Sequence, residues 1–274
     1  MKYRPKILSS NVNISPTSPW KEFLLLAGGL LGIAVVLYLV LGFAVELLVP
    51  RLSPKIEQAL ANNLLRKLHI SENDAPEKNK ALQELLDRLQ QHCPGLPYHC
   101  TIRLASTQKV NAIALPGGTI VIFAGLLDTV TSENELAFVL AHELGHFSHR
   151  DHLRGMGRGL VVMTLGTLLL GTDSQINQLL ASALNLTEMR FSRRQESSAD
   201  LFALEVVQST YGHTGGALAF FEKLALGDRT RYTGHYFSTH PQHSQRINDL
   251  QDYCFQQGFQ QGPLTPLPGT LSRP

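Results

Sequence analysis

The strongest constraint on the fold is a stretch of 23 residues without a charged side chain, which runs from Phe23 to Val45. Nearly all of its side chains are apolar. Because a helix of about 20 apolar residues spans the hydrocarbon core of a bilayer, this stretch predicts a transmembrane helix, which we place at residues 22–49. It is too long, and starts too far into the chain, for a typical cleaved signal peptide. The alternative is a helix buried in a protein core.

The residues before this stretch indicate its orientation. Residues 1–21 are polar, contain four lysine and arginine residues, and are predicted to form a flexible basic tail. Because basic residues are enriched on the cytoplasmic side of a span, we expect the N-terminus in the cytoplasm. The protein would then cross the inner membrane of a bacterium once, with its main domain in the periplasm.

The remaining composition is that of a folded domain. Hydrophobic residues make up 43% of the chain and charged residues 17%, and the net charge of +2 gives no reason to expect nucleic acid as a partner. None of the three cysteines lies in a C-x-x-C pattern, so a cysteine zinc site is not expected. Cys93 and Cys100 either close a small disulfide loop or remain free thiols.

Apolar periodicity predicts an α+β domain that is mainly helical, with a small β-sheet. Leucine stripes at helical spacing predict amphipathic helices over residues 54–69 and 79–92. Three runs typical of strands follow, at 101–105, 110–114 and 119–123. The turn at Pro116-Gly117-Gly118 predicts that the last two strands pair with each other.

The motif His142-Glu143-Leu144-Gly145-His146 follows these strands. Ser132 and Glu135 form the pattern of a capping box, so a helix is predicted to be running when the chain reaches the motif. Since positions i and i+4 share a helix face, both histidines can bind one metal ion. Glu143 lies beside them, where a carboxylate can take a proton from water on that metal. The alternative is two half-buried histidines with Glu143 in solvent.

A zinc ion held by two histidines needs a third protein ligand and an open position for water. Glu196 is the candidate, and Asp200 lies one helical turn later, where it can hydrogen-bond a ligand imidazole. The alternative is an acidic pair on the surface. A rival third ligand is His152, which has the spacing of the H-E-x-x-H-x-x-G-x-x-H pattern, although His149 replaces its glycine.

Three further segments can be interpreted from the sequence. His240 and Arg246 could stabilise the oxyanion of an attacked amide, His240 could instead cap the metal in a resting state, or both could be ordinary loop and surface residues. The apolar run 159–171 is too short to span a membrane and predicts a buried hairpin or a segment that dips into the membrane. Residues 256–274 contain four prolines and are predicted to be a disordered tail.

The chain resembles the HtpX-like zinc metallopeptidases, a family that also contains the membrane CaaX prenyl proteases. The resemblance covers roughly residues 100–250 and rests on motifs in the same order: Asn111–Gly118 with Gly125–Asp128, His142–His146, Glu196–Asp200, and Ser238–Pro241 with Arg246. It implies a zincin-like metallopeptidase domain, placed at residues 54–255, with one Zn²⁺ per chain. It also implies endopeptidase activity, often in membrane or envelope quality control. Only one clear span is visible, so the layout is more similar to the single-anchor members.

These observations combine into one hypothesis, a membrane-anchored zinc endopeptidase of the His₂Glu (gluzincin) type. Its metal ligands would be His142, His146 and Glu196, with Glu143 as general base and Asp200 supporting an imidazole. Unfolded or membrane-associated proteins and peptides would bind as an added strand beside Asn111, Ala112, Ile113 and Ala114. The alternatives are a latent or non-hydrolytic zinc-bound chaperone or scaffold of the same fold, and a peptidase for small or lipid-modified peptides. The sequence leaves the oligomeric state open.

Overall fold

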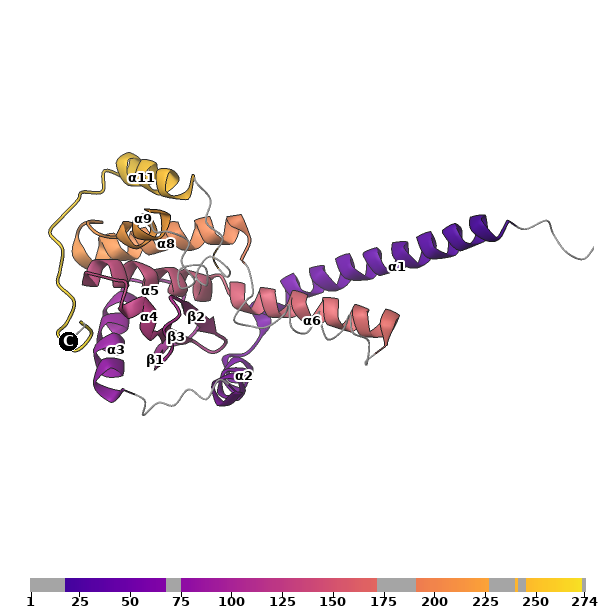
Figure 1. The fold of residues 1–274 in the computed structure, drawn as a ribbon, viewed down its shortest axis with the longest axis horizontal. Helices are drawn as coiled ribbons and strands as arrows, with labels where there is room; N and C mark the ends of the chain where they lie inside the picture. Colours follow the sequence, from indigo (N-terminus) through magenta and orange to yellow (C-terminus); the bar gives the residue numbers. More distant parts are fainter. Residues whose placement is uncertain (1–17, 68–74, 172–190, 227–239, 241–244, 273–274) are drawn as a thin grey trace, which may run out of the picture.

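The computed structural model describes residues 18–67, 75–171, 191–226, 240 and 245–272. Figure 1 shows a mainly helical domain with a small sheet, from which helix α1 (Pro19–Leu48) projects as a long arm. Most of the predicted basic tail at 1–21 lies outside the described residues. The prediction of a mainly helical α+β fold with an N-terminal apolar helix is confirmed.

Helix α1 begins with a proline, which suits the first helical turn because its missing N–H would have no partner there. None of its residues is buried, so the alternative of a core helix is wrong. Within the described ranges, it is the one helix long and apolar enough to cross a membrane. A single 3₁₀ turn, η1 (Val49–Arg51), connects it to α2 (Pro54–Lys67).

Three strands form one sheet in the order β1-β3-β2: β1 (Thr101–Ala105), β2 (Ala112–Leu115) and β3 (Thr119–Phe123). β3 pairs with β1 in parallel and with β2 in antiparallel orientation. Gly117 and Gly118 both have positive φ in the β2–β3 turn, which glycine adopts without a steric penalty. The predicted pairing of the last two strands is therefore confirmed.

The outer edge of β1 is covered, whereas β2 is the other edge strand of the sheet. Helix α3 (Pro76–Gln90) buries its leucine stripe in the core and turns polar side chains to β1. Gln83 accepts a hydrogen bond from the Ile102 N–H at 2.9 Å, and Asn79 accepts one from the Leu104 N–H at 2.8 Å. Side chains thus satisfy the edge of β1, which would otherwise be open to another strand.

After the short helix α4 (Ala124–Leu127), helix α5 (Glu133–Ser148) runs through the centre of the domain and packs along α8 (Arg193–Tyr211) (Figure 1). A Cβ on Gly145 would lie 2.9 Å from the Ala199 Cα, so the glycine permits a backbone-to-backbone approach of the two helices. Helices α9 (Ala219–Leu226) and α11 (Arg246–Gln257) complete the described helices on this side.

Of the two interpretations of the run 159–171, the buried hairpin is wrong. Residues Asp151–Leu170 make one continuous helix, α6, which lies beside α1 outside the main body of the domain (Figure 1). Gly157, Val161 and Leu165 recur at four-residue spacing along α6. Val161 and Leu165 are buried although α6 lies outside the main body of the domain. The prediction failed because the helical face of this segment packs on a helix more than 100 residues away in sequence.

The predicted disorder of residues 256–274 is wrong for the part that is described. The Glu133 N–H donates to the Thr265 carbonyl at 2.9 Å, the Thr265 N–H donates to the Asn134 side chain at 2.7 Å, and Leu271 is buried. The prolines suit this extended backbone, which is held by the first turn of α5. All three cysteines are free thiols.

Candidate active site

The H-E-x-x-H motif lies on α5, and its two histidines and Glu143 are fully buried. Ser132 caps the helix by accepting a hydrogen bond from the Glu135 N–H at 3.2 Å, as the sequence predicts. The Glu135 carboxylate does not complete the box, because it accepts from the Thr131 N–H and pairs with Lys223. Because the motif lies within this helix, the four-residue spacing of its histidines places both imidazoles on one face.

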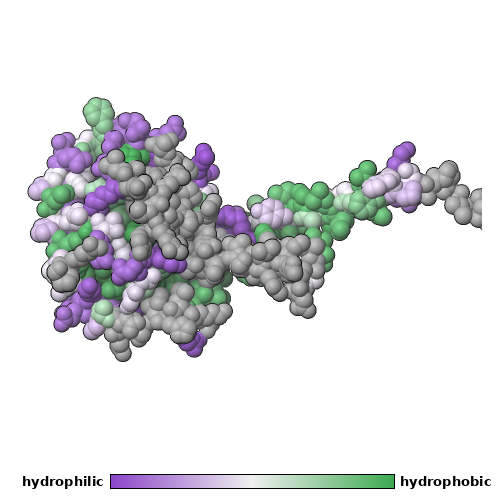
Figure 2. Space-filling model, viewed as in Figure 1, coloured by the Kyte–Doolittle hydropathy of each residue, from purple (hydrophilic) through white to green (hydrophobic). Residues whose placement is uncertain are grey.

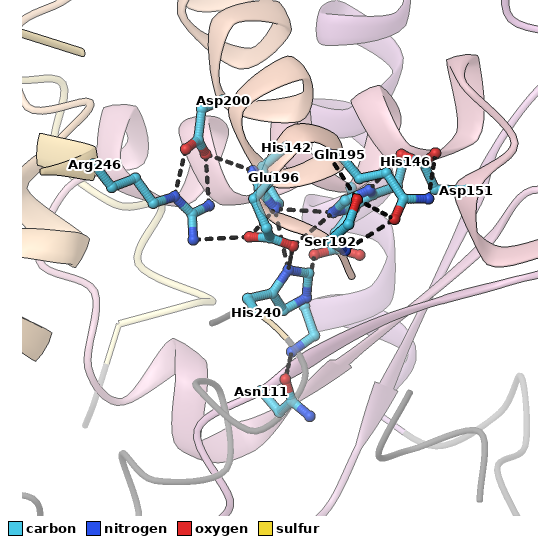
Figure 3. Close-up of polar contacts among 12 residues, drawn as sticks. Asn111, His142, His146, Asp151, Ser192, Gln195, Glu196, Asp200, His240 and Arg246 are labelled. Carbon is cyan, nitrogen blue, oxygen red and sulfur yellow. Dashed lines mark hydrogen bonds and ion pairs between the residues drawn. The ribbon is translucent and has the colours of Figure 1, made fainter. Parts of the chain in front are cut away.

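The two imidazoles face each other through their Nε2 atoms, which lie 3.1 Å apart. Their Nδ1 atoms point outward to carboxylates: His142 Nδ1 lies 2.8 Å from Asp200, and His146 Nδ1 lies 3.0 Å from Asp151 (Figure 3). A carboxylate accepts a hydrogen bond from a protonated Nδ1, so the Nε2 of each neutral imidazole presents a lone pair. Two lone pairs this close repel each other unless a cation lies near both.

Glu196 lies beside these nitrogens, as the prediction for a third ligand requires. Its carboxylate oxygens are 3.5 Å from His146 Nε2 and 3.7 Å from His142 Nε2. It lies in the first turn of α8, which Ser192 and Gln195 cap reciprocally. The close approach of Gly145 to α8 therefore places Glu196 and Asp200 within reach of the α5 histidines.

His240 contributes a fourth donor to the same cluster. Its Nδ1 lies 3.2 Å from His142 Nε2 and 3.0 Å from Glu196 Oε1. One ligand atom from each of His142, His146, Glu196 and His240 lies within 4.8 Å of the others, and all four residues are buried. The segments on either side of His240 lie outside the described residues.

The donor set fits a zinc ion. Tetrahedral ligation with Zn–N distances of about 2.0–2.1 Å separates two ligand nitrogens by roughly 3.3 Å, close to the 3.1 Å between the two Nε2 atoms. Imidazole nitrogen and carboxylate oxygen are zinc ligands. The outward hydrogen bonds to Asp200 and Asp151 are the support that ligating histidines usually have.

The pKa values in the cluster follow from burial and close charges. Burial lowers the pKa of His142 despite its hydrogen bond to Asp200. Burial also acts to lower the pKa of His146, but hydrogen bonds to Asp151 and Glu196 outweigh it and raise the pKa to about 9. Burial acts to raise the pKa of Glu196, but His240 and His146 outweigh it, so the pKa falls well below its ordinary value. Such a site favours bound positive charge.

Glu143 differs from the other acids of the site. Both of its carboxylate oxygens are buried and have no hydrogen-bond partner among the described residues. His240 Nε2 lies 3.5 Å from its Oε1. A buried carboxylate without hydrogen bonds is costly, so its position points to a role in chemistry at the cluster.

Arg246 is buried, which excludes the alternative of a surface arginine. Its guanidinium donates to Asp200, with Nη2 at 2.7 Å from Oδ1, and its Nη1 lies 2.7 Å from Glu196 Oε2 (Figure 3). Burial acts to raise the pKa of Asp200, but Arg246 and His142 outweigh it and lower the pKa. The guanidinium thus holds two site carboxylates ionised and in position.

The edge strand β2 lines the other side of the site. A small cavity lies between residues 112–116 of this strand and its turn, Glu143, and Phe191, with His152, Met156 and His240 completing its wall. Figure 3 shows Asn111 next to His240. The segment Asn111, Ala112, Ile113 and Ala114 therefore borders the cluster, where the sequence analysis placed a substrate strand.

His152 does not join the cluster, contrary to the rival ligand pattern. Its Nε2 lies 3.8 Å from Glu57, on the far side of a turn in which Arg150 has φ +53°. The turn instead aims Asp151 at His146. Sequence reasoning missed Asp151, which Gln195 also contacts at 2.8 Å, and Phe191, which stacks on His146 with ring centroids 3.8 Å apart. An acid five residues after the second histidine was the available signal.

Comparison with known proteins agrees with this geometry. The model of peptidase family M48 matches residues 76–254. The chain belongs to peptidase family M48. Members of this family are zinc metallopeptidases, so the expected kinship with HtpX-like metallopeptidases is confirmed.

Several relatives carry names that state a proteolytic activity. Metalloprotease YcaL of Escherichia coli is 29% identical over 178 residues, which cover 63% of this chain and 68% of the relative. Metalloprotease LoiP of the same bacterium is 28% identical over 63% of this chain and 69% of its own length. The mitochondrial metalloendopeptidase OMA1 of Arabidopsis thaliana is 35% identical over 57% of this chain, but only 31% of OMA1 is covered.

Proposed function

We propose that this M48 protein is a membrane-anchored zinc endopeptidase in which His142, His146 and Glu196 hold the metal. The observation that carries the proposal is the pair of inward-facing Nε2 atoms 3.1 Å apart, with Glu196 beside them. The Glu143 carboxylate lies 3.5 Å from His240 of the same cluster and has no hydrogen-bond partner among the described residues. A bound zinc ion would acidify a water molecule and polarise the scissile carbonyl.

The residues of the chain would divide the remaining work. Glu143 accepts a proton from the attacking water and later donates it to the leaving amine nitrogen, so the proton balance closes. Asp200 and Asp151 keep Nδ1 protonated on the two histidines and leave Nε2 for the metal. Arg246 fixes Asp200 and Glu196 by ion pairs, so its role is positioning of these carboxylates.

The substrate would be an extended peptide that pairs with β2. This strand is an edge of the sheet and borders the cluster, and an edge strand offers unpaired backbone groups to a peptide. Backbone pairing recognises unfolded chain of almost any sequence. Unfolded or membrane-associated proteins are therefore the substrate class that we infer.

His240 supports a second candidate, a latent form of the enzyme. Its Nδ1 occupies the position of a fourth donor, and a catalytic zinc site needs that position for water. Withdrawal of His240 would open the site, after which its imidazole could stabilise the oxyanion. A chain in which His240 never withdraws would be a zinc-bound scaffold without turnover.

The apolar helix α1 and the basic residues at and before its start support a location for the chain. We infer a single-pass protein of the inner membrane with its peptidase domain in the periplasm. One relative, 27% identical over 65% of this chain and 39% of its own length, is named a putative beta-barrel assembly-enhancing protease of Vibrio cholerae. That name is consistent with a role in envelope protein quality control for this chain too.

Cleavage of an unfolded protein tests the proposal. Purified full-length wild type, Glu143→Gln and His240→Ala proteins are incubated with casein, and the zinc content of each is measured. We expect cleavage by the wild type and none by Glu143→Gln at equal zinc content. If only His240→Ala cleaves, the latent form is the correct description. If zinc-loaded wild type and His240→Ala are both inactive, the endopeptidase proposal fails.

A further inference from the structure

We propose that α6 enters the bilayer beside α1 and holds the peptidase site at the membrane surface. The proposal rests on the proposed function in one respect, that α1 is the membrane anchor. It assigns a second lipid-contacting element to the chain and narrows the substrates to segments that emerge from the bilayer.

The first observation is the packing of the two helices. The α1–α6 pair runs antiparallel outside the domain (Figure 1). A Cβ on Gly157 would lie 2.6 Å from Val45 Cγ1, so the helices touch at a glycine, as closely packed membrane helices do. Arg150 joins their domain-side ends by donating to the carbonyls of Val49 at 2.8 Å and Leu52 at 3.0 Å.

The second observation is the position of the charges. Glu46 follows the uncharged run of α1, and it pairs with Arg154 at 2.7 Å and with Arg158 at 3.1 Å. Arg158 is the last charged residue of α6. On the domain side, the charges of both helices therefore end at one level, and the next charges of α1 are Lys21 and Glu22 at its far end. Such a level is expected where two helices leave the headgroup region and enter hydrocarbon.

The third observation is the exposed apolar face beyond that level. Leu160 is 65% exposed and Leu168 is 72% exposed. Figure 2 shows the exposed surface of α1 as mainly hydrophobic, in contrast to the mixed surface of the domain. From Gly159 to Leu170, α6 rises by about 17 Å, roughly half of a hydrocarbon core of about 30 Å. The bilayer that receives α1 would therefore also receive the apolar end of α6.

A polar hollow of about 520 Å³ lies at the base of the two helices. Three arginines, Arg154, Arg158 and Arg194, line it together with His149, and they face two carboxylates, Glu46 and Asp151. Its net positive charge, at the level where the charges of α1 and α6 end, suits the phosphates of lipid headgroups.

The insertion of α6 would fix the distance between the metal cluster and the lipid headgroups. Asp151 is the first residue of α6 and contacts the ligand candidate His146. Arg158 follows seven residues later, about 10 Å along the helix axis. The metal cluster would thus lie within roughly two helical turns of the headgroups. Substrates would be chain segments that leave the membrane or lie on it.

The test measures the depth of single sites in a bilayer. Full-length variants Leu168→Cys, Leu30→Cys and Gln256→Cys are labelled with an environment-sensitive fluorophore. They are reconstituted into phosphatidylcholine vesicles with a minority of phosphatidylglycerol. Quenching by nitroxides on the lipid acyl chains is then compared. The three native cysteines are buried, so the introduced thiol takes the label, and Gln256 on α11 is an exposed site remote from the arm.

We expect severalfold stronger quenching for Leu168→Cys than for Gln256→Cys, and quenching comparable to that of Leu30→Cys. If Leu30→Cys is quenched and Leu168→Cys matches Gln256→Cys, the inference is overturned while the anchor stands. If Leu30→Cys is not quenched, the membrane anchor itself is wrong. If Leu168→Cys escapes lipid quenching and instead forms disulfide-linked dimers, a second copy of the chain covers this face and the inference is also overturned.

Discussion

Gly145 of the H-E-x-x-H helix lies against Ala199 of α8, so closely that an added Cβ would be 2.9 Å from the Ala199 Cα. This contact determines how near Glu196 and Asp200 come to the two histidines of α5. The zinc motif and the acidic motif, about 50 residues apart in sequence, meet because residue 145 has no side chain.

A methyl group at this contact should therefore affect the metal site. In Gly145→Ala, α8 must move outward, and we expect a loss of about 1–3 kcal/mol in the free energy of unfolding, typical of overpacking. Zinc affinity should fall at least tenfold. Thermal unfolding and chelator competition measure both quantities. Gly269→Ala is the control, because nothing lies within 4 Å of its added Cβ; equal behaviour of the two variants would contradict the account.

Asp151 lies outside the H-E-x-x-H motif, but its loss should lower the affinity for zinc. Its carboxylate holds His146 Nδ1 at 3.0 Å, and loss of such a support typically lowers metal affinity by about 10–100-fold. We expect this loss in Asp151→Asn with unchanged helix content, measured by zinc titration and circular dichroism. Asp252→Asn, an exposed change on α11, should bind zinc like the wild type. Wild-type affinity in Asp151→Asn would show that the contact is incidental.

The edge of β2 provides a test of how substrate binds. The Phe123 N–H donates to the Asn111 carbonyl, and antiparallel ladders alternate, so the N–H of Ala114 points away from β3. Ala114→Pro removes this donor on the open edge, where proline is tolerated. We expect casein cleavage to fall at least tenfold at full zinc content, whereas Ala114→Ser should retain activity. Unchanged cleavage by the proline variant would exclude backbone pairing at this position.

The buried cysteines should be chemically inert in the folded protein. Burial raises the pKa of Cys93 to about 12 and that of Cys100 to about 12, so both thiols stay neutral near pH 8, where only a thiolate reacts quickly. Native protein should resist iodoacetamide at pH 8, and unfolded protein without reductant should take up three labels by mass spectrometry. Because these pKa values are raised in the fold, stability should fall as pH rises from about 9 to about 12. Rapid native labelling would contradict the described burial.

The sequence correctly predicted the features that depend on residues close together in the chain. The Ser132 cap, the glycine turn between β2 and β3, and the spacing of His142 and His146 each involve residues within a few positions of one another. Glu196 was predicted from the coordination needs of zinc. The three proposed ligands His142, His146 and Glu196 could be predicted because each lies in a segment whose sequence indicates a helix.

The two failures in the fold, α6 and the C-terminal segment, involve partners distant in sequence, whereas Asp151 lies only five residues after its partner His146. α6 was interpreted as a possible hairpin, since nothing near Gly157 indicates that Val45 will pack on it. The C-terminal segment was taken as disordered, since its hydrogen bonds are made by Glu133 and Asn134. Asp151 was overlooked because a left-handed turn at Arg150 is needed to return its carboxylate to His146. Composition and periodicity contain no information on such pairings.

The most direct test of the central claim is the zinc content of the purified full-length protein, measured by elemental analysis. Two variants on helix α8 are compared with the wild type. Glu196→Gln removes a proposed ligand, and Glu205→Gln changes an exposed residue of the same helix. The account predicts one zinc per chain in the wild type and in Glu205→Gln, and a substantial loss in Glu196→Gln. A wild type without zinc, or a Glu196→Gln protein that binds zinc as tightly as the wild type, would contradict it.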